Sequence, residues 1–389
     1  MQAMSEHNAG AKQRILLCSS NATKEYILDV LEAIAVPRGF IIHFRYEKKW
    51  VSEDLWQRLP VKGQNHDDLK GAEVLVLYVI QERDNGTRTW KSIYPLRFGS
   101  LLECYRTGDG DNDIAHFYFE TRDYCDSGNL EYIRPQLLSK FGKGDDSSAK
   151  YFAAFSGETG NDAIMKKCPW DESAFNSLVR NFKLEHFRSD DSRKQYYPVF
   201  LFVRGLLNPS LQKTRGDILQ MCYEVVERKS YVFEASLRFL ESPDPCSRVT
   251  IDSPEEQIAM LPRAENAIAS RYDEFKWNII MPRVVKNVET AIILSTKVCP
   301  PRDDCEVCEV LDLTLPIPLV IKFDWRVRLI EVVGDISLAL SATAIGMLGI
   351  IEKFLPDGVR NWGSWVLGFV VVLFCLGTLI KAYLQWEGK

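Results

Sequence analysis

Two long apolar segments near the C-terminus constrain what this chain can fold into more than any other feature. They span residues 329–351 and 363–383. A helix needs about 20 residues to cross the hydrocarbon core of a bilayer. The short connector between them contains Pro356, Asp357 and Gly358, which favour a turn. The pattern predicts a transmembrane helical hairpin after a large soluble body; the competing interpretation is a buried hairpin in a globular core.

The overall composition gives no sign of a membrane protein, so only these two segments predict membrane insertion. The chain has 389 residues, of which 46% are hydrophobic and 26% charged, as in ordinary globular proteins. The net charge of −5 excludes a general electrostatic attraction to nucleic acid. Without the hairpin, enough chain remains for two domains.

The cysteines and the N-terminus predict where the body lies. The ten cysteines are scattered, unlike the regular framework of a small secreted domain. Residues 1–7 contain no apolar signal region, so we expect insertion to depend on the C-terminal helices. Both features favour a reducing, cytoplasmic location for the body.

Hydrophobic periodicity predicts an α+β, mainly antiparallel β body. A strand at 14–18, a helix capped by Asn21 or Thr23 and a strand at 40–46 begin the chain. A β-branched run at 73–80 and a strand at 93–105 flank the pair Asn85-Gly86, which is a strong hairpin signal. Later strands are expected at 268–280, 289–296 and 307–322.

We therefore predict five regions. They are a disordered tail (1–12), an N-terminal α+β domain (13–125), a mixed linker and helical region (126–195), a sandwich- or barrel-like β domain (196–326) and the transmembrane hairpin (327–387). In the mixed region a helix is expected from 171 to 186. The last strand leads almost directly into the first membrane helix, which would couple motion in the sheet to that helix.

The motifs of common enzyme classes are absent. The sequence has no Gly-x-Ser-x-Gly elbow, no His-Glu-x-x-His, no Walker loop and no Gly-x-Gly-x-x-Gly. The glycine-containing stretch 156–161 lacks the lysine of a phosphate-binding loop and is expected to be an ordinary loop. His43 and His116 lie in predicted strands and are expected to be structural. We predict a protein that is not an enzyme and needs no cofactor.

Two clusters resemble metal sites, and both are weak. Asp109, Asp111 and Asp113 begin like a calcium loop, but the sixth position lacks glycine and the flanks are strands, which favours a hairpin turn. The other cluster comprises the cysteines Cys299, Cys305 and Cys308, whose spacing suits zinc only if a distant fourth ligand exists. We interpret these as unliganded loop cysteines.

Basic residues on the N-terminal strands form the candidate ligand site. They are Arg83, Arg88, Lys91, Arg97, Arg106 and Arg122. With Trp90, Tyr94 and Tyr105 nearby, they could line a groove for a phosphate-bearing ligand or single-stranded nucleic acid. The alternative is a solvated face of the sheet.

The first predicted membrane helix has one face that does not suit lipid. Glu331 and Asp335 are four residues apart and share this face. The small residues along it are Ala339, Ala342, Gly346 and Gly349. Such a face should contact protein or water, so we expect homo-oligomers with rings of acids at a cation-selective pore mouth. In a passive anchor, both acids would only sit among lipid headgroups.

The basic residues around the hairpin predict its orientation. Lys322, Arg326 and Arg328 precede the first segment, and Lys381 and Lys389 follow the second. The connector carries only Lys353 and Arg360. Positively charged flanks stay on the cytoplasmic side, so both termini are expected in the cytoplasm.

The order of parts, a β-rich body followed by a terminal hairpin, resembles the two-helix membrane effectors of bacterial anti-phage defence systems. The resemblance implies a Hailong-like or cyclic-nucleotide-triggered effector in the bacterial inner membrane. It further implies that a nucleotide or oligonucleotide, made by a partner enzyme, gates an oligomeric pore and causes abortive infection. The alternative is a membrane-tethered binding or scaffold protein with a passive anchor.

Overall fold

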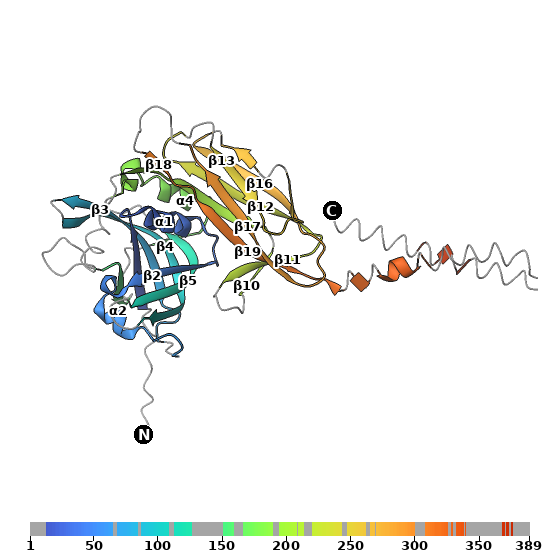
Figure 1. Ribbon diagram of the computed structural model, residues 1–389, viewed down its shortest axis with the longest axis horizontal. Coiled ribbons are helices and arrows are strands. Elements are labelled where there is room, and N and C mark those ends of the chain that lie inside the picture. The colour runs from blue at the N-terminus through green and yellow to red at the C-terminus, as the bar shows by residue number, and fades with distance from the viewer. Residues whose placement is uncertain are drawn as a thin grey trace, which may run out of the picture.

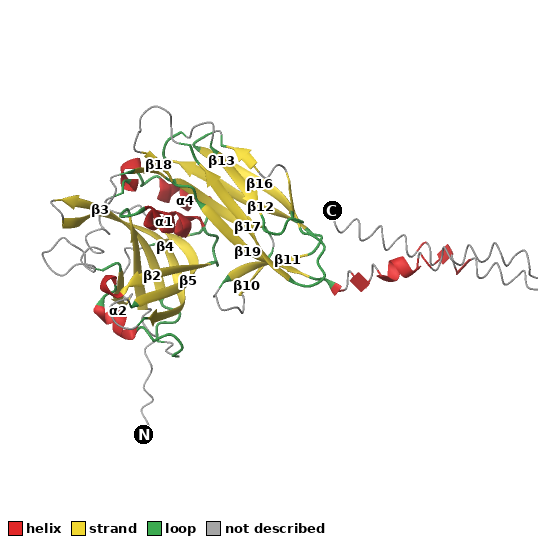
Figure 2. Cartoon of the chain, in the orientation of Figure 1, coloured by secondary structure: helices red, strands yellow, loops and turns green. Residues whose placement is uncertain are grey.

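The structure is a computed structural model that describes most of the body. The described residues are 13–64, 68–84, 87–108, 113–126, 151–158, 166–189, 194–207, 209–213, 220–242, 247–261, 265–268, 270–299 and 308–325, with short stretches at 328–329, 332–337, 339, 368–369, 371–372 and 375. Strands dominate these residues, as the sequence predicts, and they form several sheets (Figure 2).

The first sheet is built mainly from the N-terminal strands. Its order is β2-β5-β4-β3-β1-β6, with β7 paired to β5. The bounds are β1 Gln13–Ser20, β2 Ile41–Glu47, β3 Glu73–Asp84, β4 Thr87–Thr107, β5 Ile114–Cys125, β6 Ala153–Glu158 and β7 Lys167–Cys168. Only β1 and β3 pair in parallel among these strands; the other pairs are antiparallel. The predicted hairpin at positions 85 and 86 is confirmed by the pairing of Asp84 with Thr87.

Helix α1 covers one face of this sheet. It spans Lys24–Ala35, and the Thr23 side chain accepts a hydrogen bond from the Tyr26 amide, which confirms one of the two predicted caps. Its buried face contacts β1 and β4 and, on the other side, strand β9 of the second unit. The short helices η1 (Lys48–Trp50) and α2 (Glu53–Arg58) follow β2.

The second unit is a β-sandwich. One layer has the order β10-β11-β19-β17-β13-β15 and the other β14-β16-β12-β9. The bounds are β9 Val199–Leu206, β10 Ser210–Lys213, β11 Met221–Val226, β12 Ser230–Phe239, β13 Arg248–Asp252, β14 Ala259–Leu261, β15 Glu265–Ala267, β16 Tyr272–Ile280, β17 Val288–Lys297 and β19 Thr314–Lys322. Figure 1 shows the two units side by side, with α1 and α4 (Glu172–Val179) between them.

The prediction of one continuous strand at 307–322 is wrong. It is divided into β18 (Cys308–Val310), which pairs with β8 (Gln195–Tyr197), and β19 in the sandwich. The break is caused by a contact with an earlier segment, because Asp312 accepts a hydrogen bond from the Val298 amide at 3.1 Å. The Leu313 amide is likewise held by the Thr296 hydroxyl at 3.1 Å.

One apolar core joins the two units. Phe187, in the 3-10 helix η2 (Leu184–Phe187), lies 5.5 Å from Tyr78 of the first sheet and 5.7 Å from Phe200 of the sandwich, between ring centroids. Phe175 of α4 lies 5.4 Å from Phe202. The segment predicted as a mixed linker therefore supplies side chains that pack between the sheets, and burial of such rings resists separation of the units.

The predicted hairpin lies mostly outside the described residues. Residues 332–337 are helical and lie beyond the end of β19 (Figure 1). Within the described part of the chain, none of the helices has both the length and the apolar character needed to cross a bilayer.

Candidate functional site: an arginine pocket between α4 and the sandwich

Helix α4 supplies one wall of the site. The Asp171 carboxylate caps it by accepting a hydrogen bond from the Ala174 amide at 2.8 Å. The helix expected to reach residue 186 ends at Val179, because the Asn181 side chain donates to the carbonyl of Ser177 at 3.0 Å. Phe182 then turns inward and stacks on Phe200 with 5.6 Å between ring centroids. This early end leaves Arg180 at the C-cap, exposed and beside the sandwich.

The sandwich supplies the opposite wall. Arg238, near the end of β12, pairs in register with Tyr272 at the start of β16. The next amide, that of Phe239, donates to the Arg271 carbonyl at 2.9 Å. The Arg271 side chain is exposed and donates to the Ser242 hydroxyl at 3.2 Å. The antiparallel register of two neighbouring strands therefore places two arginines at one end of the sheet.

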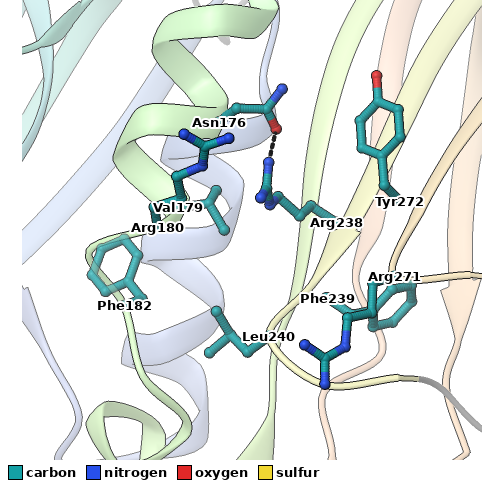
Figure 3. Close-up of a pocket in the computed structure, with 9 residues that line it drawn as sticks. All are labelled: Asn176, Val179, Arg180, Phe182, Arg238, Phe239, Leu240, Arg271 and Tyr272. Carbon is teal, nitrogen blue, oxygen red and sulfur yellow. Dashed lines mark hydrogen bonds between the residues drawn. The ribbon is translucent and has the colours of Figure 1, made fainter.

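A cavity of about 480 Å³ lies between these walls. Its lining consists of Asn176, Val179, Arg180, Phe182, Arg238, Phe239, Leu240, Arg271 and Tyr272 (Figure 3). Figure 3 shows Arg238 reaching from β12 toward α4, where its guanidinium donates to the Asn176 side-chain oxygen. We call this cavity the arginine pocket; its size is typical of small-molecule sites.

The electrostatics of the arginine pocket favour an anion. Burial, and then the positive charge of Arg180, lower the pKa of the Arg238 guanidinium from its usual value, while Tyr272 opposes the change. Arginine nevertheless remains charged at neutral pH. A bound anion would relieve the repulsion between Arg180 and Arg238, because it would lie close to both positive charges.

The nearest carboxylates are held outside the lining. The Tyr272 hydroxyl contacts Glu172 and also Glu274, the latter at 2.8 Å, and it donates its single proton to one of them at a time. Burial and these two carboxylates raise the pKa of Tyr272. Arg204 donates to the other oxygen of Glu172 at 2.8 Å. The carboxylates are thus occupied by their own partners, and the lining itself presents guanidinium, amide and phenol groups.

The predicted basic groove is not assembled, and for Arg97 the prediction is wrong. Arg97 is 1% exposed, and its guanidinium donates to the carbonyls of Ala33, Val36 and Arg122. It lies over the Tyr124 ring and binds the C-terminal end of α1, where a positive charge is favourable. Burial lowers its pKa to about 10. Arg97 therefore holds α1 on the sheet and cannot contact a ligand.

The other members of the predicted groove lie apart. Lys91 is exposed and pairs with Glu82 at 3.0 Å, whereas Arg106 stands over Trp56 of α2. Arg122 is exposed on β5. The side chains of Arg83 and Arg88 lie outside the described residues, although their backbones pair at the β3–β4 hairpin.

The histidines and cysteines do not form a metal centre in the described part of the chain. His43 and His116 lie on neighbouring strands with 3.0 Å between their ring nitrogens. Of the weak zinc candidates, Cys299 is disulfide-bonded, so its sulfur is not a free thiolate ligand. Cys305, Asp109, Asp111 and the side chain of Cys308 lie outside the part of the chain that the structure describes.

Most of the predicted pore face also lies outside the described residues. This holds for Glu331, Ala342, Gly346 and Gly349. Asp335 and Ala339 are described as helical and exposed.

A buried ion pair connects the sandwich to this C-terminal segment. Glu227, between β11 and β12, is 1% exposed in its side chain and pairs with Arg328 at 2.9 Å. Its carboxylate also accepts hydrogen bonds from the amides of Val284 (3.0 Å) and Asp324 (3.2 Å). We call this cluster the Glu227 joint. It ties the first residues after β19 to both layers of the sandwich.

The sequence reasoning missed the arginine pocket and the Glu227 joint. Positions 180, 238 and 271 are far apart in the chain, and no local pattern joins them. A partial signal existed, since Arg238 interrupts the apolar end of a predicted strand and Arg180 ends an amphipathic helix.

Comparisons with known proteins do not identify the chain. No family model and no curated protein matches it. Similar solved structures include the E. coli chaperone DraB, at 12% identity over 33% of this chain and 56% of that chain, with a TM-score of 0.21. The Salmonella enterica complex of SafA pilin with the SafB chaperone is similar at 9% identity over 26% and 50%, with a TM-score of 0.19. SSP-19, an MSP-domain protein like family member in Caenorhabditis elegans, is similar at 13% identity over 26% and 92%, with a TM-score of 0.17.

The chain spans about half the length of the first two of these structures. At these TM-scores the similarities support no argument about fold or function.

Proposed function

We propose that this protein is an oligomeric membrane effector whose β-rich body binds an anionic ligand and thereby controls the C-terminal hairpin. The observation that carries the proposal is the Glu227 joint, in which a buried carboxylate holds the start of the C-terminal segment against the sandwich. Such a connection would transmit a movement of the sandwich to the C-terminal segment. The protein acts without catalysing a reaction and needs no cofactor.

The arginine pocket supports a phosphate-bearing signal as the ligand. Three guanidinium groups line it, one at the end of α4 and two on the sandwich, and guanidinium binds phosphate through paired hydrogen bonds. A nucleotide or oligonucleotide, supplied by a partner enzyme, combines the required charge with a planar group for Phe239 and Leu240. Its binding would draw α4 toward β12 and β16.

Replacing Arg238 with glutamine tests this assignment. We expect the affinity for cyclic dinucleotides, ATP or inorganic phosphate to fall at least tenfold in calorimetry, because one charge-assisted hydrogen bond contributes about 1.5–3 kcal/mol. Arg248→Gln, on strand β13, is the matched control and should change affinity less than twofold. Equal affinities for both variants, or binding that is lost only on Arg106→Glu, would refute the assignment.

The C-terminal hairpins would form the pore, as their sequence indicates. Copies of the chain assemble in the bacterial inner membrane, and the first helix of each faces the pore with Glu331, Asp335 and the small residues that follow. Opening would depolarise the membrane and arrest infected cells as an anti-phage defence.

The Glu331→Gln, Asp335→Asn double variant tests the pore. In planar bilayers we expect the wild-type protein to conduct cations in preference to anions, and the variant to lose most of that selectivity, because the acidic rings attract cations. Replacing Glu352 and Asp357 in the connector is the control for nonspecific loss of charge. A purified protein that never conducts would favour the membrane-tethered scaffold.

The cysteines give conflicting indications of the side of the membrane on which the body lies. Cys18, Cys104, Cys125, Cys168 and Cys222 are free thiols, as in the cytoplasm, whereas the disulfide at Cys299 is typical of an oxidising compartment. We propose the cytoplasmic orientation, since the positive flanks also favour it. If Arg122, which is exposed, is replaced with cysteine, we then expect a membrane-impermeant maleimide not to label that cysteine in intact spheroplasts.

A further inference from the structure

A second cavity lies at the carboxyl ends of the parallel strands β1 and β3. Its volume is about 560 Å³, and its walls come from the end of β1, the first turns of α1, and β2 with the residues that follow it. The carboxyl ends of parallel strands commonly hold ligands, because the loops that follow them leave an open crevice. This cavity shares no lining residue with the arginine pocket.

Gln81 lines this cavity with a buried polar side chain. The Asn21 side chain fixes its backbone by accepting from the Gln81 amide at 2.6 Å and donating to the Gln81 carbonyl at 3.0 Å. Its side chain lines the cavity and is 3% exposed, yet Oε1 has no hydrogen-bond partner. An unpaired buried amide oxygen is costly, so a ligand that donates a hydrogen bond there would recover the lost interaction.

The charged groups around the cavity are mainly acidic. Asp29, Glu25 and Glu47 contribute carboxyl groups, whereas Arg45 is the single arginine or lysine in the lining. His43 also lines the cavity, but burial and then the neighbouring His116 lower its pKa to about 4, so it is neutral at pH 7. A phosphate group would meet more negative than positive charge here.

Aromatic side chains complete the walls. Tyr26 of α1 is 45% exposed and lines the cavity. Trp50 and Phe152 lie opposite in edge-to-face contact, with 5.3 Å between ring centroids. Aromatic faces attract cations, particularly amines, through the ring quadrupole.

Several hydroxyl groups of the lining are already engaged. Ser19 donates to the Tyr26 carbonyl at 2.8 Å, and Tyr46 donates to the Cys18 carbonyl at 3.0 Å. Thr23 caps α1. The acceptors left for a ligand are therefore the Gln81 amide oxygen and the lining carboxylates, among which we single out Asp29.

We propose that this cavity binds a small organic cation that carries N–H donors, with its nitrogen between Asp29 and Gln81 and its carbon skeleton against the aromatic walls. The proposal goes beyond the anion-controlled function and does not depend on it. An amine, an amidine or a guanidine would suit these groups, and a free phosphate or nucleotide would not.

Tyramine and its neutral analogue 4-hydroxyphenylethanol are suitable probes, because they differ only in the amino group. We expect tyramine, agmatine or spermidine to bind the full-length protein in detergent at least tenfold more tightly than the neutral alcohol. Calorimetry with Asp29→Asn should show at least a tenfold loss for the amines, whereas Arg238→Gln should leave their affinity unchanged. If none of the three amines binds below 1 mM, or if AMP binds this cavity instead, the proposal is wrong.

Gln81→Leu gives a second test that does not depend on a folding defect. Without ligand, we expect this variant to have a Tm about 2 °C higher, since it removes an unpaired buried oxygen. With saturating amine, its Tm should rise less than that of the wild-type protein. A variant that is destabilised without ligand but stabilised fully by the amine would contradict the assigned role.

The pH dependence of amine binding is a third test. Burial, and then the negative charges of Glu32 and Glu25, raise the pKa of Asp29 to about 7, while Arg45 on β2 lowers it. The partly buried Tyr46 interacts with Asp29 from the same strand. Because the cation prefers the ionised carboxylate, affinity should rise about tenfold from pH 6 to pH 8. The Asp29→Asn variant should show a flat profile over this range, and the same slope in both proteins would overturn the assignment.

The two proposed sites fail independently. Loss of phosphate binding in Arg238→Gln bears only on the arginine pocket, and loss of amine binding in Asp29→Asn bears only on the β1–β3 cavity. A protein that binds amines but never conducts would disprove the effector function and leave the second site intact.

Discussion

Replacing Glu227 with alanine should lower the free energy of unfolding of the body by about 3–5 kcal/mol. The Glu227 carboxylate is buried and holds Arg328 and the amides of Val284 and Asp324. Removing it takes a buried carboxylate away from the guanidinium of Arg328, and both amides lose an acceptor. Urea unfolding monitored by tryptophan fluorescence measures the change.

Glu224→Ala is the matched control for this experiment. Glu224 lies three residues earlier, on β11; its side chain is 36% exposed and pairs with Lys322 at the longer distance of 3.6 Å. Exposed ion pairs contribute about 0–1 kcal/mol, so this variant should remain close to wild type. Similar losses in the two variants would mean that the Glu227 joint has no special structural role.

Glu227→Gln separates stability from control of the hairpin. Glutamine keeps the size of the side chain and one acceptor but removes its negative charge. We expect anion binding in the arginine pocket to stay within twofold of wild type, whereas the ligand-dependent change in conductance falls. If the response to ligand is unchanged in a folded Glu227→Gln protein, the Glu227 joint does not carry the signal.

Replacing Arg97 with methionine should destabilise the N-terminal sheet by about 3 kcal/mol or more. Methionine fills much of the volume but donates no hydrogen bonds, so the carbonyls of Ala33, Val36 and Arg122 lose their donor. The positive charge at the end of α1 is lost as well. Thermal and urea unfolding by circular dichroism would measure this loss.

Arg122→Met is the control for Arg97. Its side chain is exposed on β5, and surface substitutions of this kind change stability by about 0.5 kcal/mol. The sequence alone assigns both arginines to one ligand groove. Unfolding free energies that differ by less than 1 kcal/mol between the two variants would contradict the structural role of Arg97.

Local patterns predicted most of the elements. Alternating apolar residues, the Asn85-Gly86 turn and the Thr23 cap act within a few residues of one another, so they specify strands, a hairpin and a helix start without knowledge of the whole fold. The errors lie where a distant contact overrides the pattern. The strand at 307–322 is broken by Asp312, which reaches back to Val298.

Candidate sites were much less predictable than elements. A charged residue in a strand is interpreted as exposed because burying an isolated charge is unfavourable. Arg97 escapes that rule because the carbonyls at the end of α1, more than sixty positions away, accept hydrogen bonds from its guanidinium. The sequence contains both partners, but nothing local relates them.

The sequence by itself determined that the chain has a mainly β body and a highly apolar C-terminal region, because periodicity and segment length are local properties. Only the tertiary structure decided which charges meet. Packing of α4 against the sandwich brought Arg180 to Arg238 and Arg271, and the turn after β11 brought Glu227 to Arg328. Such sites arise from the pairing of distant segments, whose register is set by the burial of the whole core and not by the charged residues themselves.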